Sequence, residues 1–397
     1  MTLAFSEAML ADDWCDGLFL GRIETADGPS PVLLRSGVLH DMSRVAPTVA
    51  QLVADRAFDP SAGIALGDVT SISLSAGADL RLLSPVDLQC VKAAGVTFAV
   101  SAIERVIEER ARGDAAKAAD VRAMLEERIG GGIRGLQPGS PEAMALKQVL
   151  IDQGMWSQYL EVAIGPDAEI FTKSPVLSTV GWGAEIGVRS DSIWNNPEPE
   201  IAILADSRGN PVGATLANDV NLRDFEGRSA LLLGKAKDNN ASCALGPFVR
   251  LFDRDFTMGD VRSAEVELLI EGADGYVLKG HSSMREISRD PTDLLAQAMS
   301  EHHYPDGYIL LLGTLFAPTQ DRDEQGRGFT HKIGDVVSIS TPRLGRLVNR
   351  VTHAKSAAPW TLGIAELMRN LASRGLLVGR DSGALVPEAP NGDAGPH

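Results

Sequence analysis

The sequence predicts an α+β protein that is mainly β, with a small β-rich N-terminal domain and a larger strand-rich domain. Three observations point to this class. The chain has 40 glycines but only 5% aromatic residues, which is typical of many turns between short strands. Apolar residues at helical spacing concentrate between residues 102 and 159. Residues 169–351 instead contain short apolar runs separated by glycine turns.

Length and composition limit the function classes. The 397 residues are 44% apolar and 23% charged, which is typical of a folded globular protein with room for two domains. The net charge of −16 argues against nucleic acid and anionic membranes as partners. We find neither an apolar run of about 18 residues nor a signal peptide with a basic start. The 3 cysteines are far apart, so we expect a reducing, cytoplasmic location.

The N-terminal domain is predicted to comprise residues 1–85. Apolar runs between residues 17 and 83 are divided by the turn at Ser36-Gly37, which indicates a hairpin or small sheet. Residues 47–54 form a short helix candidate. The domain ends at Ser84-Pro85, because proline and the residue before it both favour extended backbone.

The second domain is predicted to comprise residues 86–377. Apolar stripes predict helices within residues 102–129, interrupted at Gly113 and ended by Gly130, and a further helix over 141–159. Together they form a helical lid or insertion at about residues 101–160. A closing helix is expected over residues 359–371. The Gly-, Pro- and Asp-rich tail, residues 378–397, is expected to be disordered.

The most informative segment contains two glutamates, Glu198 and Glu200, at the start of an apolar strand. Their spacing of two places both side chains on one face of the strand. The turn at residues 207–211 leads into a second apolar strand that ends at Asp219, so a hairpin would bring Asp219 to both glutamates. Three carboxylates with no nearby His or Cys suit Mg²⁺ or Mn²⁺. The alternative is that Glu198 and Glu200 are solvated charges at a strand end, as isolated Glu-x-Glu pairs often are.

Several further motifs occur in an order that resembles the fumarylacetoacetate hydrolase superfamily. In chain order they are Gly95-Val-Thr-Phe98 with Ser101 and Glu104, Phe171-Thr-Lys173-Ser-Pro175, Glu198-Pro-Glu200, Asn218-Asp219 with Arg223-Asp224, Lys237 before Leu245-Gly-Pro247, Gly313-Thr314, and Gly334-Asp335 with Leu344 to Asn349. The resemblance covers residues 88–352, and residues 17–83 are similar to the small N-terminal domain of that family.

This resemblance implies a mixed β-roll catalytic domain that binds Mg²⁺ through Glu198, Glu200 and Asp219. The metal would chelate the carboxylate and keto oxygens of a small-molecule 2-oxo acid. The implied site residues are Lys237, Glu104 and Ser101 as catalytic residues and Arg223, Thr314, Lys173 and Phe98 as substrate-binding residues. His281, in a predicted loop, is a further candidate for recognising a substrate hydroxyl. The family also implies a homodimer or a homotetramer.

The departures from the family pattern narrow the reaction. Hydrolytic members carry a lid histidine where this chain has Ser101, and their His–Glu dyad activates water to cleave a carbon–carbon bond. A serine hydroxyl is too weakly acidic to serve as that base near neutral pH. With the insertion and the segments at residues 287–291 and 314–319, the pattern is similar to the branch that dehydrates 2-keto-3-deoxy sugar acids.

The sequence therefore predicts a Mg²⁺- or Mn²⁺-dependent hydro-lyase that converts a 2-keto-3-deoxy-pentonate to 2-oxoglutarate semialdehyde in pentose catabolism. Lys237 is assigned as the base at C3 and Glu104 as the acid at the C4 hydroxyl, although these roles could be exchanged. Two alternatives stay open: a hydrolase of acylpyruvates, and a non-catalytic 2-oxo-acid binder. From the residues alone, Glu104 could equally lie on a solvated helix face with Glu108 and Glu109, and Arg223 could pair with Asp224.

Overall fold

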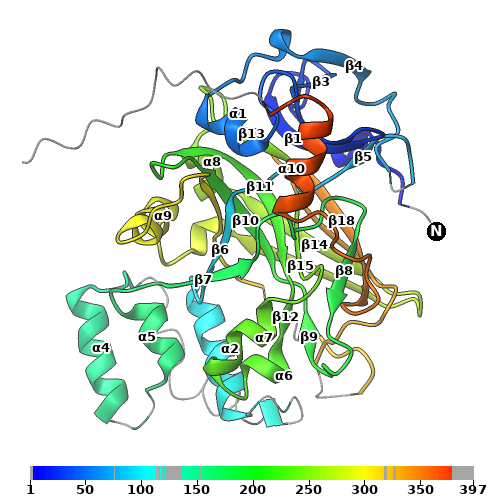
Figure 1. Ribbon diagram of the computed structural model, residues 1–397. Helices are drawn as coiled ribbons and strands as arrows, with labels where there is room; N and C mark the ends of the chain where they lie inside the picture. Colours follow the sequence, from blue (N-terminus) through cyan, green and yellow to red (C-terminus); the bar gives the residue numbers. More distant parts are fainter. Residues whose placement is uncertain are drawn as a thin grey trace, which may run out of the picture.

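The computed structural model describes residues 3–75, 77–112, 114, 117–118, 120, 136–152, 154, 156–316, 320–324 and 328–377, apart from the side chains of residues 99 and 100. Within these residues, an 11-stranded sheet and a 5-stranded sheet form the body of the molecule, and most helices lie at its periphery (Figure 1). Among the same residues, no helix is long and apolar enough to cross a bilayer.

The larger sheet has the order β4-β3-β2-β1-β13-β11-β10-β16-β6-β7, and β5 pairs with β1 at one side. Its strands are β1 (Leu18–Thr25), β2 (Gly28–Arg35), β3 (Val38–Asp41), β4 (Ile64–Asp68), β5 (Arg81–Leu82), β6 (Cys90–Gly95), β7 (Glu169–Ser174), β10 (Pro199–Ala205), β11 (Pro211–Asp219), β13 (Cys243–Leu251) and β16 (Tyr308–Leu311). The sheet thus joins the N-terminal strands to strands from the whole second half of the chain.

The smaller sheet has the order β15-β14-β17-β18-β8, and a separate ladder pairs β9 with β12. These strands are β8 (Glu185–Val188), β9 (Asn195–Asn196), β12 (Asn221–Leu222), β14 (Glu265–Glu271), β15 (Val277–Ser283), β17 (Val336–Thr341) and β18 (Gly345–His353). The longer helices are α1 (Val49–Ala54), α2 (Ala99–Arg110), α4 (Pro141–Asp152), α5 (Gln158–Ile164), α9 (Pro291–Met299) and α10 (Ile364–Ser373), and the shorter ones are α6 (Arg223–Glu226), α7 (Leu233–Lys237) and α8 (Met258–Arg262).

The N-terminal strands form the predicted hairpin. Ser36 and Gly37, both with positive φ, make the turn between β2 and β3. The β1 strand also pairs with β13, with Phe19 opposite Arg250, so the N-terminal strands continue the sheet of the following residues. The domain boundary at residue 85 therefore stays a prediction.

The hairpin of β10 and β11 positions the site. Pro199 lies opposite Asn218 and Glu200 opposite Ala217, as the turn chemistry predicted. Every residue of β10 is buried, because its side chains alternate between two hydrophobic clusters on the two faces of the sheet. This close packing on both sides holds the start of β10 and the end of β11 in one place.

The helices differ from the sequence prediction in three places. The lid helix begins at Ala99, and residues 121–135 lie outside the described part of the chain. The single helix predicted over residues 141–159 is instead two, α4 and α5. The chain turns at Gly154, which has a positive φ, and Ser157 then caps α5. The closing helix begins at Ile364 and lies against the N-terminal strands (Figure 1), and the predicted disordered tail lies outside the described residues.

Candidate active site

Three buried carboxylates meet at one end of the hairpin. Glu198 directly precedes β10, Glu200 is its second residue, and Asp219 ends β11. One oxygen from each lies within 4.8 Å of the others, and no residue of the three is more than 3% exposed. The sequence prediction that the hairpin joins these residues is confirmed.

The charge of this triad is only partly compensated. Burial, together with the charges of Asp219 and Glu198, raises the pKa of Glu200 well above its ordinary value. Its carboxylate accepts one backbone hydrogen bond, from Gly313 N at 2.7 Å. Carboxylates this close and this buried are unfavourable together unless a proton or a cation joins them. Three hard oxygen donors of this kind fit a divalent metal ion such as Mg²⁺ or Mn²⁺.

Two lysines reach the triad from neighbouring elements. Lys237, at the end of α7, contacts Glu198 and lies 3.2 Å from Asp219, whereas Lys173 on β7 lies 2.9 Å from Asp219. Burial would raise the pKa of Asp219, but the two lysines outweigh it and lower that pKa. Burial would likewise lower the pKa of Lys237, but Asp219, Glu198 and Glu226 outweigh it and raise that pKa. These neighbours therefore favour the protonated form of Lys237.

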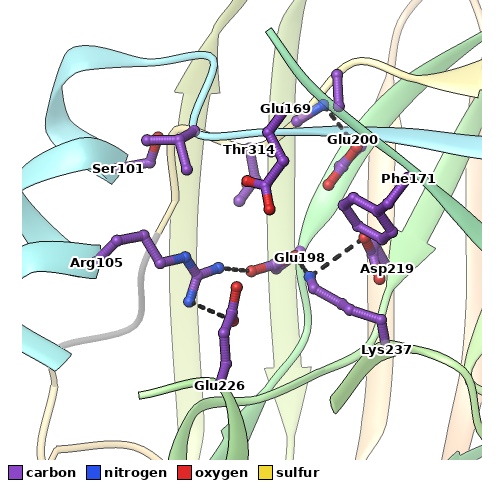
Figure 2. A pocket seen from close by; sticks show the side chains of 14 residues that line it. Ser101, Arg105, Glu169, Phe171, Glu198, Glu200, Asp219, Glu226, Lys237 and Thr314 are labelled. Atoms are coloured by element: carbon purple, nitrogen blue, oxygen red, sulfur yellow. Dashed lines mark hydrogen bonds and ion pairs between the residues drawn. The ribbon is translucent and has the colours of Figure 1, made fainter. Parts of the chain in front are cut away.

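The lid helix α2 presents a polar face to the triad. Ser101, Glu104, Arg105 and Glu108 follow helical spacing and so share one side of the helix. The Arg105 guanidinium contacts Glu198 and lies 2.9 Å from Glu226 of α6 (Figure 2). It also lies 2.7 Å from Glu108. The sequence prediction missed Arg105, Glu108 and Glu226 as site residues. The two residues on the helix could have been recognised in the sequence, because they belong to a polar stripe at positions i, i+3, i+4 and i+7 that begins at Ser101.

Glu104 and Arg223 form an ion pair beside the triad. Arg223 Nη2 lies 3.3 Å from Glu104, and its Nε lies 2.6 Å from Glu108. Glu104 is 6% exposed and Glu108 2%, so the alternative of a solvated helix face is wrong for both. Pairing of Arg223 with Asp224 is also wrong, because Asp224 instead accepts hydrogen bonds from Ser192 and the Ile193 amide.

Two adjacent cavities open at this cluster. The larger is lined by Glu198, Glu200, Asp219 and Lys237, and also by Glu169 and Glu226, which the sequence prediction did not include. Glu169 of β7 points into this space in Figure 2. Its carboxylate lies against Gly95, where a Cβ would approach Oε2 to 2.1 Å, so any side chain at position 95 would displace this carboxylate. Burial raises the pKa of Glu169, and it raises the pKa of Glu226 to about 7.

The remaining predicted residues differ in which of the two cavities they line. Ser101 and Thr314 line both cavities, and Ser101 Oγ also donates to Phe98 O at 2.7 Å in the first turn of α2. Glu104 and Arg223 line only the smaller cavity. Lys173 is fully buried and acts on the site through Asp219 rather than by lining either cavity.

The geometry corrects two substrate-binding predictions. Phe98 is fully buried in the hydrophobic core and lines neither cavity. His281 does not lie in a loop: it lies on β15, is more than half exposed, and pairs with Glu265 at 2.9 Å. The side chains of β15 alternate between solvent and core, and the position of His281 is one that points to solvent.

Comparison with known proteins agrees with the fold. The fumarylacetoacetate (FAA) hydrolase C-terminal family model matches residues 157–352, just under half of the chain, so these residues are similar to that family. Within it, the chain resembles enzymes that dehydrate sugar acids. It is 31% identical over 183 residues to 2-dehydro-3-deoxy-D-arabinonate dehydratase of Saccharolobus solfataricus, and the aligned region covers 46% of this chain and 58% of the relative. It is 32% identical over 201 residues to a probable 2-keto-3-deoxyxylonate dehydratase of Haloferax volcanii, and the aligned region covers 51% of this chain and 66% of the relative.

Solved structures show the same fold. The apo form of 2-keto-3-deoxy-D-arabinonate dehydratase superposes with a TM-score of 0.60 at 22% identity, covering 85% of this chain and 99% of that one. Its complex with magnesium and 2,5-dioxopentanoate gives a TM-score of 0.59 at 24% identity, with coverage of 85% and 99%. The predicted α+β, mainly β architecture of the fumarylacetoacetate hydrolase type is therefore confirmed.

Proposed function

We propose that this protein is a Mg²⁺-dependent hydro-lyase that dehydrates a 2-keto-3-deoxy sugar acid, with a pentonate as the preferred substrate. The observation that carries the proposal is the larger cavity, where the carboxylate triad faces Lys237 and Glu169. The two dehydratases that the chain resembles support the substrate class. The aligned regions span about three fifths to two thirds of their lengths.

The metal would be held by Glu198, Glu200 and Asp219, whose unbalanced charge fits a divalent cation. When bound there, Mg²⁺ or Mn²⁺ would polarise the keto oxygen of a 2-oxo acid and stabilise the enolate that forms next to it. The solved relative with magnesium and 2,5-dioxopentanoate supports this choice of metal.

The proton transfers are assigned from the lining of the larger cavity. Glu169, whose pKa is raised by burial, is suited to accept a proton from C3 of the substrate. Lys237, which its carboxylate neighbours keep protonated, is suited to donate a proton to the C4 hydroxyl. The C4–O bond then breaks, water leaves, and a double bond forms between C3 and C4. For a pentonate, tautomerisation of this product would give 2-oxoglutarate semialdehyde.

This assignment differs from the one that the sequence suggested. Glu104 lines only the smaller cavity, and its carboxylate is paired with Arg223. The larger cavity instead offers Glu169 as the second proton-transfer group. Among the described residues that line the two cavities, none is a histidine, which favours elimination over hydrolysis of a carbon–carbon bond.

A product assay tests the proposal. Purified protein with Mg²⁺ should release an aldehyde from 2-keto-3-deoxy-pentonates and should not cleave acylpyruvates into two acids. Removal of metal with EDTA should abolish turnover, and Mg²⁺ or Mn²⁺ should restore it. Cleavage of acylpyruvates would support the hydrolase alternative, and binding of 2-oxo acids without turnover would support the non-catalytic one.

We further propose a cytoplasmic homodimer or homotetramer. The three cysteines are free thiols, and free thiols are typical of proteins in a reducing compartment such as the cytoplasm. Light scattering on the purified protein would determine the mass of the assembly.

A further inference from the structure

The smaller cavity lies directly beside the larger one. It is lined by Asn196, Arg223, Glu104, Glu108 and Phe316, together with Ser101, Arg105, Glu198 and Thr314, and the last four residues also line the larger cavity. The ion pair between Arg105 and Glu198 thus stands in the wall that both cavities share. A ligand bound at the triad therefore has a second polar compartment within reach of its far end.

Asn196 carries an unused hydrogen-bond acceptor in this wall. Its side chain is 3% exposed, and its Nδ2 donates to Pro197 O at 2.8 Å. A carbonyl oxygen can only accept, so this hydrogen bond determines which way the amide group is turned. The opposite atom, Oδ1, is buried and has no hydrogen-bond partner among the described residues. Such an acceptor is unfavourable until a donor, such as a hydroxyl group, reaches it.

The arginine of the cavity is already engaged. Arg223 is paired with Glu104 and Glu108, and its guanidinium lies 4.2 Å above the ring of Trp194. Its charge is therefore matched inside the protein, which argues against a second anionic group of a ligand in this cavity. With Ser101 and Thr314 supplying hydroxyl groups, the lining suits a neutral, hydroxylated group.

We propose that the smaller cavity is the subsite for the hydroxyl-bearing far end of the sugar acid, where Asn196 Oδ1 accepts a hydrogen bond from the terminal hydroxyl. This inference rests on the proposed function, because the 2-oxo end of the ligand must lie at the triad. Asn196 is then a specificity-determining residue. A ligand without the terminal hydroxyl leaves Oδ1 unpaired and binds less tightly.

The test compares the binding of two ligands by calorimetry in the presence of Mg²⁺. The ligands are 5-hydroxy-2-oxopentanoate and 2-oxopentanoate, and neither has a C4 hydroxyl to eliminate. Wild-type protein should bind the hydroxylated ligand roughly 10-fold more tightly, the usual size for one buried hydrogen bond. Asn196→Ala should bring this ratio close to 1 and leave the affinity for 2-oxopentanoate nearly unchanged. Ring closure of the free hydroxylated ligand lowers its apparent affinity by the same factor for every variant. The change in the affinity ratio between variants is therefore not affected.

Asn195→Ala is the matched control. Asn195 is the neighbour of Asn196 on β9 and is equally buried, but its Oδ1 already accepts a hydrogen bond from the His331 amide at 3.2 Å. This variant should keep the wild-type ratio. A variant that still binds 2-oxopentanoate with wild-type affinity is folded. The ratio of the two affinities in the wild-type protein tests the subsite without any variant.

Two results would overturn the subsite: equal binding of both ligands by the wild type, or an unchanged ratio in Asn196→Ala. Both leave the proposed function intact, because the 2-oxo end is still bound. If neither ligand binds to the metal-loaded protein, the subsite and the proposed function are both wrong.

Discussion

The protein contains two buried clusters of charge that are built in opposite ways. Asp335, beside the smaller sheet, receives both Nη atoms of Arg322 at 2.5 and 2.7 Å, and also the Lys332 amide at 2.9 Å. Burial would raise the pKa of Asp335, but Arg322 and His331 outweigh it and lower that pKa. Each oxygen of this carboxylate is matched by donors within the protein.

Glu200 of the triad is not matched in this way, whereas Glu198 and Asp219 contact cationic side chains. Burial and two neighbouring carboxylates raise the pKa of Glu200, and its hydrogen bond comes from a neutral backbone amide. Glu169 and Glu226 add further carboxyl groups to the same cavity. The difference teaches that a buried carboxylate can be matched by donors of the same protein, or can keep an excess of negative charge that is unfavourable until a cation, such as the proposed metal, binds. Four experiments test this contrast.

The largest effect is expected for the metal ligands. Glu200→Gln should lower kcat/KM by roughly 10³-fold or more and weaken Mg²⁺ binding, because a neutral amide replaces one of three anionic ligands. Steady-state kinetics and metal titration calorimetry measure both. Glu185→Gln, at an exposed position on β8, is the control and should behave as wild type. More than a tenth of wild-type activity in Glu200→Gln would contradict the metal site.

The next effect separates the two assignments of the proton-transfer groups. Lys237→Met and Glu169→Gln should each lower kcat by roughly 10²–10⁴-fold, the usual contribution of general acid–base catalysis. Glu104→Gln should cost less than about 10-fold, because a carboxyl group outside the larger cavity does not reach the reacting atoms. A greater loss for Glu104→Gln than for Glu169→Gln would return the lid glutamate to the mechanism.

The third experiment compares the two clusters by stability. Asp335→Asn should lower the free energy of unfolding by about 1–3 kcal/mol, because the buried Arg322 loses the closer of two carboxylate partners and keeps Asp274, at 3.2 Å. Glu200→Gln, measured in EDTA, should instead raise it by roughly 1–3 kcal/mol, because an unfavourable buried charge is removed. Urea unfolding of both variants measures these values. If both substitutions changed the free energy of unfolding in the same direction, the two clusters would not differ in how their charge is balanced.

The smallest effect concerns Glu226, whose pKa burial raises to about 7. A carboxyl group with a raised pKa in the folded state stabilises the fold at low pH, and this stabilisation is lost as the pH rises through 7. Wild type should therefore lose stability relative to Glu226→Gln between pH 5 and pH 8, by up to roughly 3 kcal/mol. Urea unfolding in EDTA across this range measures the difference. A difference that does not change with pH would show that Glu226 titrates at its ordinary pKa.

The sequence predicted well those features that depend on neighbouring residues. The turn at Ser36-Gly37 and the hairpin of β10 and β11 follow from turn chemistry and from strand alternation, which act over a few residues. Helix limits were less accurate, since Gly154 and Ser157 divide a segment whose apolar pattern reads as continuous. His281 was misplaced for a related reason, because its flanking residues read as a loop and only the pairing of β14 with β15 makes them a strand.

By itself, the sequence determined the carboxylate triad, because period-two alternation and a short turn bring Glu198, Glu200 and Asp219 together within one hairpin. Only the tertiary structure decided what surrounds it. Glu169 comes from β7, Arg105 from the lid helix and Glu226 from α6, and no local pattern relates these segments. Their convergence depends on how the sheet and the helices pack against each other. For the same reason, the unpaired Asn196 oxygen can be recognised only when all of its neighbours are in place.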